Sequence, residues 1–599
     1  MRPAAAGGEP GAPFTITTPL YYVNAAPHMG SAYPTIAADV MARFQRMRGR
    51  EVRFLTGTDE HGEKIAAAAA ARGLSPAEHC DAVAAQYEAL WAELDISYDG
   101  FVRTTAPRHE ALVAEVLGRV WDKGDIYKAS YSGWYCVDCE EYKDEKEMAP
   151  GGHDCPTHRK PCQHREEENY FFALSKYQDQ LAELIGNTDF VQPSARRNEV
   201  LGWVKEGVRD FSISRANCSW GIPMPRDPSH TVYVWFDALN GYLSGLLPLE
   251  RGAAAANGSA NGDAAAGGAL EGLAGVGWPA DVHVIGKDIL RFHAIYWPAM
   301  LMSAGLPLPK QVFGHGFLTK DGLKMGKALG NTLDPGALVG GYGPDAVRYY
   351  FMRRVLLGQD GNFGEEAFRE TLNAELANTV GNMLNRTLGL LHKYCDGALP
   401  ASAATAAPPG HPLRAAAEDG AARAAEAYDG LSPHMALEAA VGVAARGNLL
   451  LEEVAPWSAL KKGTDEEKAA AGLALVAVLE AARVVALLLA PVTPRLASRM
   501  LQQLGLGGDG VDGGAAALAG AAWGDTAWGA LPAGHATPAP TPVFVRIDDT
   551  VPYATEAAPG GGAVAGGGGK GGGKQQPKQP KQPKQPKQPK QPKAEEVQA

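Results

Sequence analysis

The stretch that decides the fold is residues 14–31, which read Phe14-Thr-Ile-Thr-Thr-Pro-Leu-Tyr-Tyr-Val-Asn-Ala-Ala-Pro-His-Met-Gly-Ser31. Its first four residues have the aromatic and β-branched character of a strand. After a loop with two prolines, apolar side chains recur at helical spacing from Ile36 to Met47, and a second strand-like run occupies residues 52–55. A strand, a helix and a strand in this order predict a parallel α/β sheet with its functional residues at the carboxyl ends of the strands.

The same pattern resumes far along the chain. Residues 282–285 and 312–315 read as strands, with a helix expected near residues 289–303, and residues 365–505 are almost wholly helical in pattern. We therefore expect two halves of a Rossmann-like domain, an insertion, a helical domain and a low-complexity C-terminal extension. The expected bounds are 14–132 and 231–364 for the two halves, 133–230 for the insertion, 365–505 for the helical domain and 506–599 for the extension. Residues 251–277, rich in Ala, Gly and Asn, should form a flexible surface loop.

The composition excludes several classes of protein. The chain carries 56 Lys and Arg against 67 Asp and Glu, a net charge of −11, while residues 570–599 hold eight Lys and two Glu. The rest of the chain is therefore strongly acidic, which excludes histone-like binding of nucleic acid by bulk charge but not binding through a local patch. Seven Cys are too few, and odd in number, for a disulfide-stapled scaffold.

No membrane span or secretory leader is expected. The most apolar stretch, residues 469–492, is interrupted by Glu480 and Arg483 and follows a capping-box pattern at Thr464 and Glu467, as in a buried helix. The first 13 residues lack the regions of a secretory signal, so an organellar leader is either absent or already removed. Six Gln-Pro-Lys units at residues 576–593 should be disordered, as a solvated tail or as a tether for polyanions such as RNA.

Two short segments could handle phosphates. At the start of the first helix, Gly30 lets a nucleotide approach the backbone, and His28 can donate to a phosphate oxygen as charge develops there. In the Gly-rich loop of residues 322–331, Lys324 and Lys327 could close over a triphosphate and neutralise a departing pyrophosphate. Taken alone, the first segment is more typical of a surface or capping histidine, and the alternative for the second is an ordinary polar turn.

A third segment has the spacing of a metal site. Cys136-Val-Asp-Cys139 is followed, after fifteen residues, by Cys155-Pro-Thr-His158. Two such ligand pairs can close one tetrahedron around Zn²⁺, and four protein ligands leave no open position, so the metal would be structural. Unrelated thiols or a redox pair are the alternative. Nearby competitors for the fourth position are His153, Cys162 and His164.

His28-x-Gly30 and the later Lys324-Met-x-Lys327 together resemble the paired signatures of class I aminoacyl-tRNA synthetases. The interval between them has no room for the large editing insertion of the synthetases for isoleucine, valine and leucine. Four further stretches are similar to methionyl-tRNA synthetases, and the resemblance runs continuously from about residue 14 to residue 500. These stretches are Thr17-Thr-Pro-Leu-Tyr-Tyr-Val-Asn24, Phe54-Leu-Thr-Gly-Thr-Asp-Glu-His-Gly62, Tyr233-Val-Trp-Phe-Asp-Ala238 and Gly286-Lys-Asp-Ile-Leu-Arg-Phe-His293.

The resemblance implies the site residues. His28, Gly30, Lys324 and Lys327 would bind ATP, with His28, Ser31 and the two lysines as catalytic groups. Asp59 and the backbone of Leu20 would hold the ammonium group of methionine. An aromatic-rich sleeve for the thioether would consist of Tyr22, Trp235, Ala238, Tyr242, Phe292 and His293.

The sequence departs from the common family pattern in both signatures. Ser31 stands where many members have a second His, and Gly326 and Ala328 stand where Ser is common. The first two replacements resemble the plant-type organellar branch, whereas Ala328 departs even from that. Ser31 can still donate to a phosphate but Ala328 removes a donor, so slower activation is expected.

The helical region carries the expected RNA contacts. Asn382 and Arg386 are four residues apart, on one helix face, and Trp457 lies on another helical segment. An aromatic plane beside Asn and Arg can stack an unpaired base and read its edges. A capped helix and a core Trp are the alternative, but the resemblance places all three residues at the anticodon-reading positions for CAU.

The resemblance implies ATP-dependent ligation of methionine to tRNA(Met) by an α/β catalytic domain with a zinc-knuckle insertion, an α-helical anticodon-binding bundle and a disordered basic tail. ATP is a substrate, Mg²⁺ accompanies it, and Zn²⁺ is structural; neither DNA nor a membrane is an expected partner. A monomer is expected, with a dimer as the alternative. The plant-type branch favours a chloroplast or mitochondrion over the cytoplasm. The competing function is a non-catalytic tRNA-binding or scaffold protein that retains the fold.

Overall fold

The computed structural model describes residues 13–136, 141–143, 148, 152–155, 160–216, 218–247, 270–320, 322–325, 332–507 and 518–548. Several expectations fall outside these residues: most of the surface loop at 251–277, the Gln-Pro-Lys repeat, Lys327, Cys139 and His158. The Rossmann-like sheet and the helical C-terminal region are both present, so the predicted fold class is confirmed for the described part of the chain.

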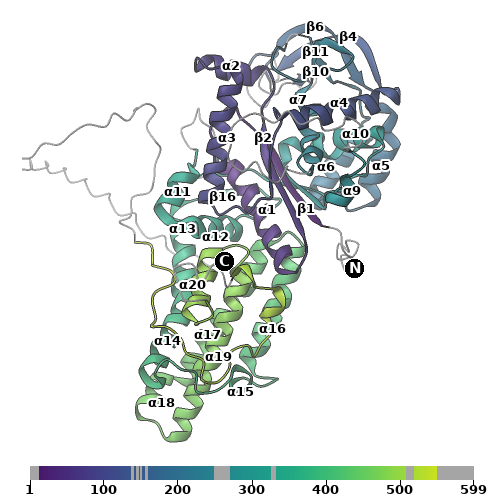
Figure 1. Cartoon of the computed structure of the whole chain (residues 1–599). Coiled ribbons are helices and arrows are strands. Elements are labelled where there is room, and N and C mark those ends of the chain that lie inside the picture. Colours follow the sequence, from purple (N-terminus) through teal and green to yellow (C-terminus); the bar gives the residue numbers. More distant parts are fainter. Residues whose placement is uncertain are drawn as a thin grey trace, which may run out of the picture. The chain divides into compact units, whose positions relative to one another are not determined.

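A six-stranded parallel sheet with the strand order β3-β2-β1-β12-β13-β7 forms the base of the site (Figure 1). Its strands are β3 (Gly100–Arg103), β2 (Val52–Asp59), β1 (Phe14–Tyr22), β12 (Val282–Gly286), β13 (Val312–His315) and β7 (Val191–Gln192). All four predicted strands are therefore present. β1 also continues to Tyr22 through a proline-containing stretch that was expected to be a loop, with a register shift between Thr17 and Leu20.

The sheet has a switch point between β1 and β12. Helix α1 (Met29–Met47) leads the chain from β1 to β2, whereas β12 pairs with the other side of β1 and leads on to β13. Across this junction the Thr17 hydroxyl oxygen lies 2.6 Å from Nδ1 of His283, 266 residues away in sequence. Connections that leave two neighbouring parallel strands in opposite directions open a crevice at the carboxyl ends of those strands.

The inserted segment contributes a strand to the main sheet, which its sequence does not suggest. Antiparallel sheets β5-β4-β6-β8 and β10-β11-β9 form most of it, but β7, from the same segment, pairs with β13. The strands of these sheets are β4 (Ile126–Cys136), β5 (Glu141–Lys143), β6 (Gln163–Phe172), β8 (Phe211–Ser212), β9 (Ser214–Arg215), β10 (Pro223–Met224) and β11 (Asp227–Val232). A further small sheet, β15-β14-β16, consists of β14 (Leu318–Lys320), β15 (Leu323–Lys324) and β16 (Gly361–Phe363).

The helices of residues 63–304 are α2 (Glu63–Ala71), α3 (Pro76–Glu93), α4 (Pro107–Asp122), α5 (Gln178–Asn187), α6 (Ser194–Lys205), α7 (Val234–Leu239), α8 (Gly241–Ser244), α9 (Leu273–Val276) and α10 (Trp297–Ala304). The single helix expected near residues 289–303 is divided. A 3₁₀ turn at Lys287–Ile289 and a π-helical turn at Phe292–Tyr296 precede α10.

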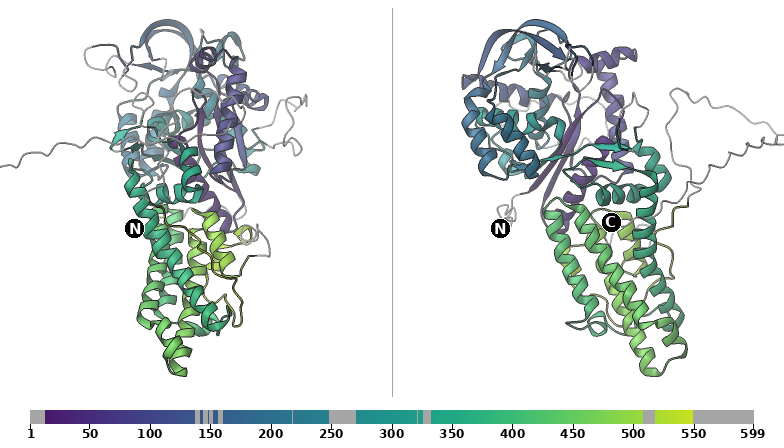
Figure 2. Two further views of the ribbon diagram at one scale, coloured as in Figure 1. Left: turned by 90° about the vertical axis from the view of Figure 1, so that its left-hand side faces the viewer. Right: turned by 180° about the vertical axis from the view of Figure 1, so that it is seen from behind.

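The helical region begins with α11 (Pro335–Tyr342), α12 (Pro344–Arg354), α13 (Glu365–Thr371) and a π-helical segment, Leu372–Gly381, that leads into α14 (Asn382–Cys395). It continues with α15 (Ala403–Ala406), α16 (Pro412–Asp429), α17 (Pro433–Val454), α18 (Pro456–Lys462), α19 (Asp465–Leu489) and α20 (Pro494–Gln503). α16, α17 and α19 lie along one another in both views of Figure 2.

Helix α19 is the core of this bundle. Its predicted capping box is present, since the hydroxyl of Thr464 accepts from the N–H of Glu467 and the Glu467 carboxylate accepts from the N–H of Thr464. Within the described chain it is the one helix long and apolar enough to span a membrane, but 94% of that stretch is buried inside the fold. The apolar sequence is explained by packing on all sides.

Residues 518–548 pack against this core helix, although the sequence placed them in the low-complexity extension. The buried Glu480 carboxylate accepts from the N–H groups of Gly529 and Ala530 at 2.8 and 3.0 Å. Arg483 pairs with Glu480 and donates to the carbonyl of Ala527 at 2.7 Å. The two charges that interrupt the apolar run therefore hold a returning segment to the bundle.

A buried ion pair joins α1 to the helical region. Arg348 on α12 and Asp39 on α1 are both inaccessible to solvent, with Nη2 of Arg348 2.6 Å from Oδ2 of Asp39. The guanidinium also donates to the carbonyls of Pro491 and Val492, just after α19, and to that of Leu94. The Arg348 side chain thus holds the C-terminal end of α19 against α1.

The charges around Asp39 stabilise its ionised form. Burial alone would raise the pKa of this carboxyl, but Arg43, Arg348 and hydrogen bonds from Ser97 outweigh burial and lower the pKa to about 2. The carboxylate contributes to stability above its ordinary pKa, and that contribution is lost only as the pH falls from near 4 toward 2.

We predict that Arg348→Met lowers the free energy of unfolding by roughly 3–5 kcal/mol, because it leaves three carbonyls without their donor and removes one of the two arginines that compensate the buried Asp39 carboxylate. Thermal and urea denaturation followed by circular dichroism measure the loss. The matched control is Arg423→Met, which removes a surface pair with Asp419 and should change stability by less than about 1 kcal/mol. Equal effects of the two substitutions would contradict the role assigned to Arg348.

Candidate active site

Helix α1 starts at the carboxyl end of β1 with His28 as its N-cap. The N–H of Gly30 donates to Nδ1 of His28 at 3.0 Å. The hydroxyl of Ser31 accepts from the His28 N–H at 3.1 Å and donates to the His28 carbonyl at 2.8 Å. This reciprocal cap holds an exposed imidazole at the positive end of the helix dipole. Ser31 is therefore a buried capping residue, a role that the sequence did not reveal; its predicted phosphate contact stays a prediction.

The segment that follows the second signature lies against the same helix start. The N–H of Met29 donates to the carbonyl of Leu333 at 3.4 Å. A cleft of about 400 Å³ lies here, and His28, Leu333 and Asp334 are among its lining residues. The hairpin of β14 and β15 ends at Lys324, where the predicted Lys-rich loop begins. Two segments some 300 residues apart in sequence thus meet at one place, although residues 326–331 lie outside the described chain.

The predicted ammonium anchor sits where β1 and β2 end side by side. Leu20 pairs with Gly57, and Tyr22 pairs with Asp59, the last residue of β2. Asp59 is only 8% exposed. Its charge acts on Tyr242, whose phenol pKa is raised by burial first and then by Tyr21 and Asp59. A carboxylate with so little water around it favours a cationic ligand.

The predicted thioether sleeve is a continuous aromatic surface. The rings of Trp235 and Phe292 stack with centroids 3.8 Å apart and planes 3° apart. The Tyr242 hydroxyl lies 2.7 Å from Nε2 of His293, whose Nδ1 donates to the carbonyl of Ile289 at 3.0 Å. Burial lowers the pKa of His293 to about 4, so the imidazole is neutral and accepts from the tyrosine. Ala238 lies on α7, three residues after Trp235.

This arrangement suits a ligand with a cation at one end and an apolar chain at the other. The carboxylate comes from a strand end, and the aromatic wall comes from α7, α8 and the π-helical turn before α10. None of the wall residues carries a formal charge at neutral pH, because His293 is neutral and the Tyr242 phenol is protonated. An apolar sleeve with a few placed polar groups is the usual form of a small-molecule site.

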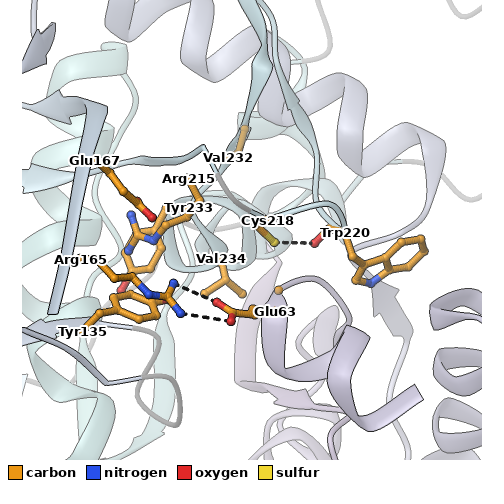
Figure 3. Close-up of a pocket in the computed structure, with 11 residues that line it drawn as sticks. Glu63, Tyr135, Arg165, Glu167, Arg215, Cys218, Trp220, Val232, Tyr233 and Val234 are labelled. Atoms are coloured by element: carbon orange, nitrogen blue, oxygen red, sulfur yellow. Dashed lines mark hydrogen bonds and ion pairs between the residues drawn. The ribbon is translucent and has the colours of Figure 1, made fainter. Parts of the chain in front are cut away.

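A second, small cavity lies beside the pocket, and no sequence pattern indicated it. Figure 3 shows Arg165 on β6 pointing at Glu63, the first residue of α2; its guanidinium donates to both carboxylate oxygens at 3.0 and 3.1 Å. The same guanidinium lies 4.2 Å from the centroid of the Tyr135 ring. This contact joins the insertion to the segment that follows Asp59.

The predicted anticodon residues also come together. The guanidinium carbon of Arg386 on α14 lies 5.0 Å from the ring centroid of Trp457 on α18, and Arg386 also pairs with Glu452 at 3.0 Å. Asn382 begins the same helix, one turn before Arg386. All three side chains retain partial exposure, as a surface that stacks and reads bases requires.

Comparisons with known proteins identify the family. A profile for "tRNA synthetases class I (M)" matches residues 14–165 and 152–388, and a profile for the "Anticodon binding domain of methionyl tRNA ligase" matches residues 401–557. The chain belongs to the class I methionyl-tRNA synthetase family. The second match extends past residue 505, in agreement with the packing of residues 518–548 on α19.

Relatives in the family match over almost the whole chain. The chloroplastic/mitochondrial methionine–tRNA ligase of Arabidopsis thaliana is 53% identical over 542 residues, which are 90% of this chain and 84% of the relative. The methionine–tRNA ligase of Thermosynechococcus vestitus is 52% identical over 538 residues, 89% of this chain and 97% of the relative. The solved Mycobacterium tuberculosis methionyl-tRNA synthetase in complex with methionyl-adenylate is 39% identical with a TM-score of 0.78, covering 89% of this chain and all of that one.

The predicted zinc knuckle is only partly within the described residues. Cys136 and Cys155 lie in a buried cluster with Cys162, whose thiol pKa is raised to about 11 by burial first and then by the other two cysteines. Of the competing ligands, His153 stacks on Trp134 with centroids 3.7 Å apart, and His164 meets the edge of the same ring. Among the described residues no group of three or more His, Cys, Asp or Glu is placed to hold a metal ion.

The zinc site therefore stays a prediction. Two of its four expected ligands, Cys139 and His158, are outside the described residues. The chemistry of the described part fits a thiolate-bound metal, because clustered buried thiols resist ionisation until a cation compensates their charge. When bound, the ion would tie the two ends of the knuckle together and would take no part in the reaction.

We predict that chelation of zinc, or Cys136→Ser, destabilises the insertion before the rest of the protein, because the metal contributes directly to the folding of its knuckle. Limited proteolysis and zinc analysis measure the effect. The matched control is Cys395→Ser on α14, which should leave both zinc content and proteolysis unchanged. Native protein that contains no zinc would end this prediction.

Proposed function

We propose that this chain catalyses methionine–tRNA ligation. The carboxylate of methionine attacks the α-phosphate of ATP, giving methionyl-adenylate and pyrophosphate, and the methionyl group then passes to a hydroxyl of the terminal adenosine of tRNA(Met) with release of AMP. The observation that supports the proposal is that the acidic end of β2 and the start of α1 lie at the carboxyl edge of one sheet, where the segment just after the Lys-rich loop contacts the helix start. The family match and relatives at about 50% identity support it.

The first step needs positioning and charge stabilisation more than covalent work by the protein. Asp59 and the Leu20 backbone hold the ammonium group, so the carboxylate of methionine is presented toward the start of α1. His28, the helix N–H groups, Lys324 and Lys327 bind the triphosphate and stabilise the departing pyrophosphate. Mg²⁺ enters with ATP and neutralises part of the phosphate charge.

The second step depends on recognition of tRNA by the helical region. We propose that Trp457 stacks an anticodon base whose edges are read by Asn382 and Arg386. The cation–π contact between Arg386 and Trp457 holds both side chains ready for this role. The carbonyl contacts of Arg348 connect the bundle that carries them to helix α1.

A non-catalytic tRNA-binding protein is the less favoured function. Three features of the sequence motivate this alternative: the departures from the family pattern at Ser31 and at Ala328, and the Lys-rich tail. Ser31 completes the cap of His28, and the groups that carry charge in both signatures are retained. For the compartment we propose a chloroplast or mitochondrion, supported by the Arabidopsis relative, although cyanobacterial relatives are nearly as similar. We propose a monomer.

The proposal predicts methionine-dependent exchange of pyrophosphate into ATP. Lys327→Ala should slow adenylate formation more than tenfold, equivalent to roughly 1.5–4 kcal/mol of transition-state stabilisation, with little change in the Kd for methionine. Rapid-quench kinetics of a single turnover measure the step. Well-folded wild-type protein without exchange would refute the ligase function, and an unchanged rate for the variant would refute the role of Lys327 alone.

The anticodon contact gives a separate prediction. Trp457→Ala and Arg386→Ala should each raise the KM for tRNA(Met) by about tenfold or more, since base stacking and a charged hydrogen bond are each worth roughly 1–3 kcal/mol. Methionine activation should be unchanged. Arg423→Ala, on the surface of α16, is the matched control and should leave aminoacylation unaltered. Unchanged KM in both anticodon variants would contradict the placement.

The C-terminal repeat gives a salt-dependent prediction. Deletion of residues 571–599 removes seven Lys from a chain whose remainder is strongly acidic. The KM for tRNA should rise at low salt, and the difference should shrink as salt increases, because each phosphate contact releases a condensed counterion. Aminoacylation at two ionic strengths measures it, with methionine activation as the control. Equal KM values at low salt would mean that the repeat is only a solvated tail.

A further inference from the structure

Beside the methionine pocket, one buried carboxylate binds two histidines at once. Asp237 on α7 is inaccessible to solvent. Its Oδ2 accepts from Nδ1 of His61 at 2.7 Å, and its Oδ1 accepts from Nε2 of His109 at 2.6 Å. His109 extends the network to Ser244, whose hydroxyl lies 2.8 Å from Nδ1 of the ring. Both imidazoles are less than 5% exposed.

This cluster joins the four elements around the pocket. His61 lies two residues after Asp59, and Asp237 lies between Trp235 and Ala238 on α7. His109 belongs to α4, and Ser244 belongs to α8, which also carries Tyr242. The hydrogen bond between His61 and Asp237 is therefore the short link between the ammonium anchor and the thioether sleeve.

The segment that follows Asp59 has a second fixed contact, on the side of the insertion. The indole N–H of Trp220 donates to the carbonyl of Glu60 at 2.6 Å, and the N–H of Gly62 donates to the carbonyl of Trp220 at 3.0 Å. Glu60 itself pairs with Arg103 at 2.7 Å. These contacts orient the backbone from one side, whereas the Asp237 link reaches across to α7.

The charges facing His61 favour its bond to Asp237. Burial alone would lower the pKa of His61, but Asp237 on α7, Glu110 on α4 and Glu60 in the same segment outweigh it and raise the pKa. Burial would likewise raise the pKa of Asp237, yet the two histidines lower it. The pair is a charge-assisted hydrogen bond in a dry environment, which is stronger and geometrically stricter than a neutral one.

We propose that Asp237 and His61 are positioning residues for methionine, which set the distance between the carboxylate of Asp59 and the aromatic wall on α7. This inference rests on the methionine pocket proposed above. Neither residue touches the amino acid; each acts through a neighbour two residues or fewer away that does. Displacement of the anchor from the wall weakens methionine binding selectively, while the ATP segments at α1 and the Lys-rich loop keep their geometry.

The variants separate positioning from general stability. Asp237→Ala and His61→Ala remove the link, whereas His61→Asn keeps a donor close to the position of Nδ1. The matched control is Asp281→Asn. That carboxylate is also buried, and it accepts from the N–H of Thr15 and from Lys310, both at 2.8 Å, at the opposite edge of the sheet.

The experiment measures KM for methionine and for ATP in pyrophosphate exchange, with melting temperature for every variant. Asp237→Ala and His61→Ala should raise the methionine KM by roughly tenfold or more, because misplacement by about 1 Å has effects of this size. The ATP KM should stay within about twofold of wild type. His61→Asn should recover most of the methionine affinity, and Asp281→Asn should lower the melting temperature without changing either KM.

Each failure has its own meaning. If Asp59→Asn leaves the methionine KM unchanged, the proposed pocket is wrong. If Asp59→Asn raises it but His61→Ala does not, the pocket stands and the positioning role is wrong. Equal increases of the methionine and ATP KM in His61→Ala, or no recovery in His61→Asn, also overturn the proposal. Should Asp237→Ala not fold, the pair of His61 variants decides alone.

Discussion

The parallel pairing of β1 with β12 is the constraint on which the rest of the molecule depends. These strands are 266 residues apart in sequence, yet Ile16 pairs with Val282 and Thr17 contacts His283 across the junction. The pairing places the end of β1, with Leu20 and Tyr22, beside the segment that leads to Phe292 and His293. Without it the ammonium anchor and the aromatic sleeve would belong to separate parts of the chain.

The second consequence of this topology is the place of helix α1. The helix starts at the switch point, with His28 as its N-cap, and carries Asp39, the partner of Arg348, near its middle. Its N-terminus therefore lies at the proposed ATP site. Its middle contacts Arg348, which binds the carbonyls of Pro491 and Val492 after α19. Because α1 is held at its N-terminus and at Asp39, it fixes the position of the helical bundle relative to the catalytic sheet.

The sequence predicts those parts of the site that local patterns encode. His28 and Gly30 stand at the start of an amphipathic helix, and the alternation of strand and helix places Asp59 at a strand end. Other features depend on contacts between distant segments and have no local pattern. Ser31 was predicted only as a phosphate donor, whereas in the structure its hydroxyl also closes a cap that exists only once α1 forms. The composition of residues 518–548 suggested a low-complexity extension. Their order depends on distant partners, among them Glu480 and Arg483 on α19, which no local pattern reveals.

Asp237 shows the same limit at the site itself. Asp237 lies within a family motif, so the sequence shows that it is close to Trp235. The sequence does not show that two histidines from other elements form hydrogen bonds with its carboxylate. Similarly, β7 is only two residues long and adds to the main sheet from inside the insertion. Short elements and buried polar networks owe their structure to tertiary packing, which outweighs local propensity.

The central claim is that the pocket between Asp59 and the stacked rings of Trp235 and Phe292 selects methionine for activation. Its most direct test is to incubate the purified chain with ATP, Mg²⁺, pyrophosphatase and an equimolar mixture of the twenty amino acids, and to identify the enzyme-bound adenylate by mass spectrometry. The account predicts methionyl-adenylate as the dominant product. Another aminoacyl-adenylate in its place, or no adenylate from folded protein, would contradict it.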